Sequence, residues 1–235
     1  MPLDGPRSHI LCLDDRDVTV AVHRNRRARR LTLHVDQASG EVRLVLPQRA
    51  PLREGFAFAK RKAGWIRAQL DALPPRRPFA DGAAVPYLGE NHVIRSDPMA
   101  RRGVWRDGGE IRVSGLPEFL PRRLTDFLKR EARRELTERA HRKAGVIDRQ
   151  VKRISLRDTK SRWGSCASTG EINFSWRLIM APEPVLDYVV AHEIAHLVHM
   201  DHSRAFWKQV TALTDEVAAP QRWLREHGSG LLRYG

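Results

Sequence analysis

The segment from Glu183 to about His199 constrains the fold of this chain most, because it is apolar on nearly every side. Pro182 precedes it, at a first-turn position where the missing N–H of proline has no intrahelical partner to lose. A helix that is apolar all round is buried in the core of a domain. We therefore expect the rest of the chain to cover this helix, whose apolar residues are Val185, Leu186, Tyr188, Val189, Val190, Ile194, Leu197 and Val198.

Ionisable residues interrupt this apolar helix at His192-Glu193-Ile194-Ala195-His196. Residues four apart share one helix face with Cβ atoms roughly 6 Å apart, so two imidazoles at this spacing can bind one tetrahedral zinc ion. Glu193 lies roughly 100° around the helix from His192 and can reach a water at an open coordination position. The pattern predicts His192 and His196 as zinc ligands and Glu193 as the general base of a hydrolase.

A catalytic zinc site takes a third protein ligand, and the residues alone leave three candidates. His202 has the spacing of the third metzincin histidine, which requires the helix to end and turn before it. However, His199 stands where metzincins carry glycine, and no later methionine could form their methionine turn. Glu216 (or Asp215) on a later helix would be the ligand in a gluzincin-like arrangement. The third candidate is His199 itself.

Motifs around this helix resemble the YgjP-like metal-dependent hydrolases, which are related to the SprT-like and WLM zincin metallopeptidases. The resemblance is specific over roughly residues 155–210 and looser over the N-terminal part. It implies zinc ligands at His192, His196 and His202 with Glu193 as base, and it leaves the substrate undefined. The matching segments are Ser161–Cys166, Gly170–Asn173, Trp176–Leu178, Pro182, Asp187–Val190, His192–His196 and Asp201–Trp207.

The stretch Arg162-Trp163-Gly164-Ser165 has two interpretations. In one, it is a strand with a packed tryptophan and a glycine that permits close backbone approach. In the other, it is the zincin edge strand that aligns an extended peptide beside the metal, with Arg162 stabilising an oxyanion or a phosphate. These four residues are therefore candidates for substrate binding.

The remaining patterns predict an α+β chain of two domains. Residues 1–75 form an antiparallel sheet plus a helix: strands at 18–22, 31–35 and 42–46, a turn at Ser39-Gly40 and a helix over 51–73. Pro74 to Pro78 reads as a linker. Residues 76–235 form a zincin-like catalytic domain with its core at 117–228, in which short strands precede a long amphipathic helix from Pro117 to about Ala144. We find no internal repeat in the pattern.

Composition bounds the class of protein. No apolar run approaches the roughly 20 residues that span a bilayer, and Met1 to Asp15 lacks the pattern of a signal peptide. Cys12 and Cys166 are the only cysteines, which favours a reducing cytoplasm over a disulfide framework. The net charge of +14 is explained either by a solvated basic surface or by attraction to phosphates.

These observations favour zinc-dependent hydrolysis of peptide bonds in a peptide or protein substrate. The first alternative is a metal-dependent phosphohydrolase that acts on nucleotides with the same residues. The second is a nucleic-acid-associated protein with secondary protease activity. Two arginine-rich stretches, Arg24–Arg30 and Arg122–Arg142, would form a phosphate-binding patch if they converge, and we expect weak, sequence-independent nucleic-acid binding.

Overall fold

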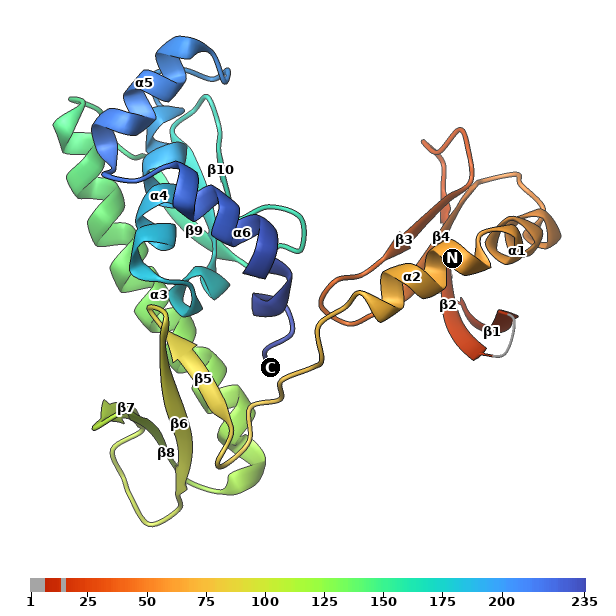
Figure 1. Ribbon diagram of the computed structural model, residues 1–235, viewed down its shortest axis with the longest axis horizontal. Helices are drawn as coiled ribbons and strands as arrows, with labels where there is room; N and C mark the ends of the chain where they lie inside the picture. Colours follow the sequence, from red (N-terminus) through yellow and green to blue (C-terminus); the bar gives the residue numbers. More distant parts are fainter. Residues whose placement is uncertain (1–6, 14–15) are drawn as a thin grey trace, which may run out of the picture. The chain divides into compact units, whose positions relative to one another are not determined.

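The computed structural model describes residues 7–13 and 16–235, and its helices and sheets make the chain a mixed α and β protein (Figure 1). The chain divides into two compact units, Met1–Pro75 and Arg76–Gly235. Each unit has its own hydrophobic core. Among the described residues, no helix is long and apolar enough to cross a membrane.

The first unit contains a four-stranded sheet with two helices packed on it. The predicted hairpin around Ser39-Gly40 is confirmed, since its two strands pair antiparallel. The helix predicted over 51–73 is divided at Lys62, whose φ of −102° and ψ of 14° depart from helical geometry. The elements are β1 (Arg7–Leu13), β2 (Arg16–Asn25), β3 (Thr32–Val35), β4 (Val42–Pro47), α1 (Leu52–Arg61) and α2 (Ala63–Asp71).

This sheet is mixed, so the prediction of an antiparallel sheet was wrong. Its strand order is β1-β2-β4-β3, and β2 pairs parallel with β4 while the other pairs are antiparallel. The reason is topological: the chain reverses once into β3 and again into β4, and β4 then inserts between β3 and β2. Period-two alternation shows which face of a strand is buried but not which strand lies beside it.

The second unit begins with another four-stranded sheet, followed by a long helix. The strands are β5 (Ala84–Tyr87), β6 (Glu90–Asp97), β7 (Val104–Asp107) and β8 (Glu110–Ser114), and the short η1 (Pro117–Phe119) leads into α3 (Leu120–Val146). A stripe on α3 enters the core because its apolar residues recur at helical spacing. These buried residues are Leu124, Phe127, Leu128, Ala132, Leu136 and Ala140.

The two four-stranded sheets repeat one topology. The second has the order β5-β6-β8-β7, with β6 and β8 parallel, as β2 and β4 are in the first. The inner strands begin alike, Glu41-Val42-Arg43 and Glu110-Ile111-Arg112, each after a glycine of positive φ. The same ion pair forms in both, at 3.1 Å and 2.9 Å. The two sheets therefore share a topology that the sequence patterns did not predict.

The rest of the second unit surrounds the apolar helix. β9 (Arg153–Arg157) pairs parallel with β11 (Glu171–Ser175), and β10 (Gly164–Cys166) pairs antiparallel with β11. After η2 (Trp176–Met180) come α4 (Glu183–Ala195), α5 (Arg204–Leu213) and α6 (Ala218–Leu231). α4 contacts α3, α5, α6 and β10. It is thus covered on several sides, which explains its apolar sequence.

Candidate metal centre

The end of α4 and the turn that follows bring three histidines together. α4 carries His192, and His196 caps it while still in helical conformation. The chain turns through residues 196–198 and enters α5 after Ser203, whose side chain accepts a hydrogen bond from the Phe206 N–H at 3.4 Å. This reversal places His202 beside the end of α4, within reach of the other two imidazoles.

The three imidazoles form a compact donor set. Each of His192, His196 and His202 offers one ring nitrogen, and these atoms all lie within 4.8 Å of one another. The Nε2 atoms of His192 and His202 are 3.2 Å apart. Two nitrogens bound to one tetrahedral zinc at about 2.0–2.1 Å would lie about 3.4 Å apart. The donor set therefore fits a single zinc ion, a metal that imidazole ligands suit.

The aromatic ring of Phe206 packs against all three histidine rings. Phe206 is fully buried, and its ring centroid lies 4.9, 4.5 and 4.8 Å from those of His192, His196 and His202. Phe206 thus limits the directions that the three imidazoles can adopt. Phe206, on the first turn of α5, was not predicted to take part in the site.

Hydrogen bonding and burial favour the metal-binding form of the histidines. His196 Nδ1 lies 2.9 Å from the His199 carbonyl oxygen, and a proton on Nδ1 donated to this oxygen leaves Nε2 free as a ligand. Burial, reinforced by His196 and His202, lowers the pKa of His192 to about 4. Burial also lowers the pKa of His196. Neutral imidazole binds metals, so little proton competition is expected at neutral pH.

Glu193 lies beside this set in a space that only glycine leaves open. Its side chain is 5% exposed, and it packs against the backbone of β10. A Cβ atom on Gly164 would lie 2.5 Å from Glu193 Oε1. Burial raises the pKa of Glu193 to about 8, and the charge of Arg162 acts in the opposite direction. A divalent cation beside the carboxyl would lower this pKa further.

A cavity of about 230 Å³ opens at His192 and Glu193, and several candidate substrate-binding residues line it. Arg162, Trp163 and Gly164 form one side, and Ser165 is not among the lining residues. Ser165 instead accepts a hydrogen bond from Asn173 Nδ2 at 3.5 Å. Successive strand residues point to opposite faces, which separates Ser165 from Gly164.

The opposite side of this cavity was not predicted from the sequence. It consists of Tyr188 and Val189 of α4 and Leu224 of α6, next to the His192 and Glu193 side chains. The Tyr188 hydroxyl accepts a hydrogen bond from Gln221 Nε2 at 2.9 Å, which ties α4 to α6. Tyr188 precedes His192 by four residues, so helical periodicity could have identified it as a neighbour of the metal ligand.

Cys166 also escaped the sequence analysis as a neighbour of the site. Burial and the nearby Glu193 raise the pKa of its thiol to about 11. The thiol is therefore protonated at neutral pH and a poor nucleophile. Cys166 is the last residue of β10, the strand against which Glu193 packs.

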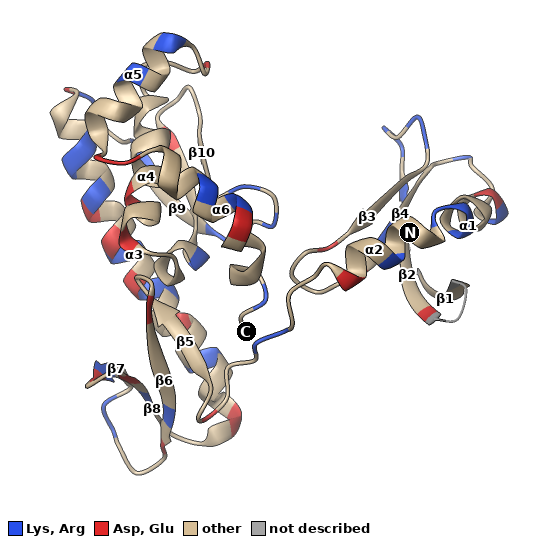
Figure 2. Ribbon diagram, in the orientation of Figure 1, with Lys and Arg blue, Asp and Glu red and all other residues tan. Residues whose placement is uncertain are grey.

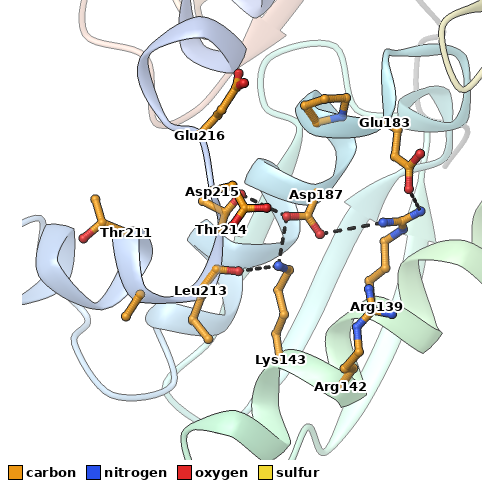
Figure 3. Close-up of a pocket in the computed structure, with 12 residues that line it drawn as sticks. Arg139, Arg142, Lys143, Glu183, Asp187, Thr211, Leu213, Thr214, Asp215 and Glu216 are labelled. Atoms are coloured by element: carbon orange, nitrogen blue, oxygen red, sulfur yellow. Dashed lines mark hydrogen bonds and ion pairs between the residues drawn. The ribbon is translucent and has the colours of Figure 1, made fainter.

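The other candidate third ligands lie elsewhere. The His199 carbonyl, not its ring, contacts His196. Asp215 and Glu216 were expected on a helix, but they lie between α5 and α6 and line a second cavity of about 520 Å³. Figure 3 shows the Glu216 side chain pointing away from the ion pairs of that cavity. The structure thus groups His202, and neither acidic residue, with His192 and His196.

Paired charges fill the second cavity (Figure 3). Lys143 of α3 donates to Asp187 Oδ2 at 2.9 Å and to the Leu213 carbonyl at the end of α5. The same Asp187 carboxylate accepts from the Thr214 hydroxyl at 2.9 Å. Arg139 lies 3.7 Å from Asp187. This Lys143–Asp187 network joins α3, α4 and the end of α5, which indicates a structural role.

Comparison with known proteins gives a family match. The family model described as YgjP-like, metallopeptidase domain matches residues 29–227, which confirms the resemblance drawn from the motifs. Comparisons with curated proteins and with solved structures give no match. The family match covers most of both units, and it includes the three histidines and Glu193.

Proposed function

Because the chain belongs to the YgjP-like metallopeptidase family, we propose that it is a zinc-dependent hydrolase whose substrate is a peptide or protein. Family membership makes it a metal-dependent hydrolase of the metallopeptidase type. The zinc, the residues that hold it and the substrate class are our proposal. In this proposal residues 76–235 are the zincin-like catalytic domain and residues 1–75 an accessory domain.

One observation carries the proposal: three imidazole nitrogens within 4.8 Å of one another lie next to a buried carboxyl group. His192, His196 and His202 would hold the zinc. Bound zinc supplies Lewis-acid chemistry, which polarises a carbonyl oxygen and acidifies a water molecule. Three protein ligands leave a position open for substrate chemistry, as catalytic zinc sites require.

Glu193 performs the proton transfers in this mechanism. Its carboxylate accepts a proton from the water whose oxygen attacks the scissile carbonyl carbon. When the carbon–nitrogen bond breaks, the carboxyl group delivers that proton to the departing amine. Gly164 keeps space for this side chain, and burial in a partly apolar site strengthens its interaction with the reacting atoms.

The cavity beside Glu193 would bind the substrate. Trp163, Tyr188, Val189 and Leu224 give it an apolar lining, which suits a side chain next to the scissile bond. Arg162 lines the same cavity, and its positive charge favours the ionised form of Glu193. A cation there would stabilise negative charge that develops on the attacked carbonyl oxygen.

Arg162 also favours a second candidate function, hydrolysis of a nucleotide phosphoanhydride. A guanidinium group binds phosphate oxygens in a bidentate manner, so the same cavity could orient a nucleotide. The peptidase proposal remains first because the matched family is described as a metallopeptidase domain.

The test is parallel assay of the zinc-loaded protein on a mixed peptide library and on a panel of nucleoside triphosphates. Wild-type protein is compared with Glu193→Gln, with zinc content measured for both. Cleavage of peptides that requires Glu193 supports the proposal. Hydrolysis of nucleotides alone would assign the second function, and activity retained by Glu193→Gln would contradict the mechanism for either substrate.

A further inference from the structure

A groove of about 600 Å³ runs between one face of α3 and the start of β9; we call it the α3–β9 groove. Arg133, Thr137 and His141 lie along it at four-residue intervals and therefore share one helix face. Lys152 and Arg153 close the other side. The groove thus joins the arginine-rich helix to a second basic segment that is distant from it in the sequence.

The charged residues that line the α3–β9 groove are mainly cationic. Glu138 is the only acidic residue among them, against Arg133, Arg134, Lys152 and Arg153. All four of these cations are exposed to solvent. The groove therefore carries a local excess of positive charge, on a chain whose net charge is already +14.

Three of these cations lack an acidic partner. Arg134 is paired, because it lies 3.1 Å from Glu131 and 2.9 Å from Glu135. Within residues 7–13 and 16–235, by contrast, no carboxylate forms an ion pair with Arg133, Lys152 or Arg153. Their charges are free to meet an anion from outside the chain.

The Lys143–Asp187 network provides the contrast on the same helix. There, Arg139 and Lys143 are largely buried and each meets carboxylates of its own chain, among them Asp187. Those cations are occupied in joining helices. Figure 2 shows further Lys and Arg residues along α3 and in the loop between β2 and β3, so the groove must be tested against that second arginine-rich region.

Protection of a sheet edge explains only part of this arrangement. β9 is an outer strand of its sheet, and charged residues on edge strands prevent pairing with other chains. Lys152 and Arg153 could serve that purpose. Edge protection does not explain why α3 also carries a cation on the side that faces β9. This cation is Arg133, whose guanidinium lies 3.5 Å from the Ile154 carbonyl oxygen.

The groove geometry favours a phosphate backbone over an acidic peptide strand. A peptide that paired with β9 would need its edge, and the Arg133 contact with the Ile154 carbonyl obstructs that edge. Phosphates need only exposed cations. Among the lining residues, His141 carries the only ring, and no Phe, Tyr or Trp is present. The groove thus lacks the row of aromatic side chains on which successive bases stack, so sequence would not be read.

We infer that the α3–β9 groove binds nucleic acid through its phosphates, without sequence preference. This inference does not depend on the proposed hydrolytic function. Arg133, Lys152 and Arg153 contact the phosphates, and binding releases the counterions that those phosphates had condensed. Binding is expected to be weak at physiological salt, with a Kd on the order of 10⁻⁴–10⁻⁶ M.

The test is fluorescence anisotropy of a labelled, mixed-sequence duplex at a series of salt concentrations. The groove variant is Arg133→Gln/Lys152→Gln/Arg153→Gln. The matched control, Arg26→Gln/Arg27→Gln/Arg29→Gln, removes the same charge from the exposed loop between β2 and β3. Each lost phosphate contact should reduce the slope of log K against log salt by about 0.9, or weaken binding about eightfold at about 0.1 M salt.

The expected result is a large loss for the groove variant and a much smaller one for the control. Equal losses would show that net charge alone attracts the nucleic acid and would overturn the inference, as would wild-type binding by the groove variant. Competition by polyglutamate as effective as that by the duplex would assign the groove to acidic proteins instead. If the triple variant fails to fold, the single variant Lys152→Gln should still lose one contact.

Discussion

Two clusters of ionisable side chains lie along α4, and they differ in how their charges are satisfied. Near the middle of the helix, Asp187 meets Lys143, Arg139 and the Thr214 hydroxyl. At the end of the helix, three imidazoles converge mainly on one another, beside a buried carboxyl group whose charge is favoured by Arg162.

The contrast separates a structural cluster from a ligand site. In the Lys143–Asp187 network, positive and negative groups neutralise each other and hold three helices together. In the histidine cluster, donor atoms of one kind face a common point, and burial disfavours the protonated forms of His192 and His196. A set of like donors around a common point is stabilised when a cation joins it.

The largest effect should follow from Glu193→Gln. The amide cannot accept the proton of the attacking water, so turnover should fall by about 10²–10⁴-fold, while the three histidines keep the metal. Turnover and zinc content are measured on the same preparation. Glu183→Gln is the matched control, because Glu183 lies at the exposed start of the same helix, and it should retain near wild-type turnover.

Lys143→Met tests the structural cluster. Removing one partner of a buried ion pair should lower the free energy of unfolding by about 3 kcal/mol, because Asp187 loses its closest cation. In the control Arg122→Met, the lost pair with Asp126 is exposed and should cost less than about 1 kcal/mol. Denaturant unfolding gives both values. Loss of zinc without loss of stability in Lys143→Met would contradict the distinction between the clusters.

A smaller effect is expected from Gly164→Ala. The added Cβ would lie 2.5 Å from Glu193 Oε1, so the carboxyl group must move, and turnover should fall by roughly 10–10²-fold. Zinc affinity should stay near that of the wild type. Gly230→Ala is the control, since no atom lies within 4 Å of its added Cβ. Equal turnover in the two variants would show that the space left by Gly164 is not needed for the action of Glu193.

The apolar helix and its motif were accessible from the sequence because both follow local rules. Helical spacing predicted that His192 and His196 share a face, and the requirement for a turn before His202 matches the end of α4 at Ala195. β3 and β4 were also close to their predicted positions, since alternation marks a half-buried strand.

Pairing between segments that are distant in the sequence could not be predicted from local patterns. Alternation gave no sign that β4 inserts beside β2 in parallel, and β1 was not predicted at all. The Lys143–Asp187 pair joins residues 44 apart, and each residue alone is an ordinary charge on a helix. The similar segments Glu41-Val42-Arg43 and Glu110-Ile111-Arg112 are visible in the sequence, but the strand order that the two sheets share is not.

The central claim is that His192, His196 and His202 hold one zinc ion, and elemental analysis of the purified protein tests it most directly. The wild type and Glu216→Gln should each contain about one zinc per chain. His192→Ala/His196→Ala should contain none, and His202→Ala should lose most of its zinc on dialysis. Full zinc occupancy in the double alanine variant, or loss of zinc from Glu216→Gln with retention in His202→Ala, would contradict the account.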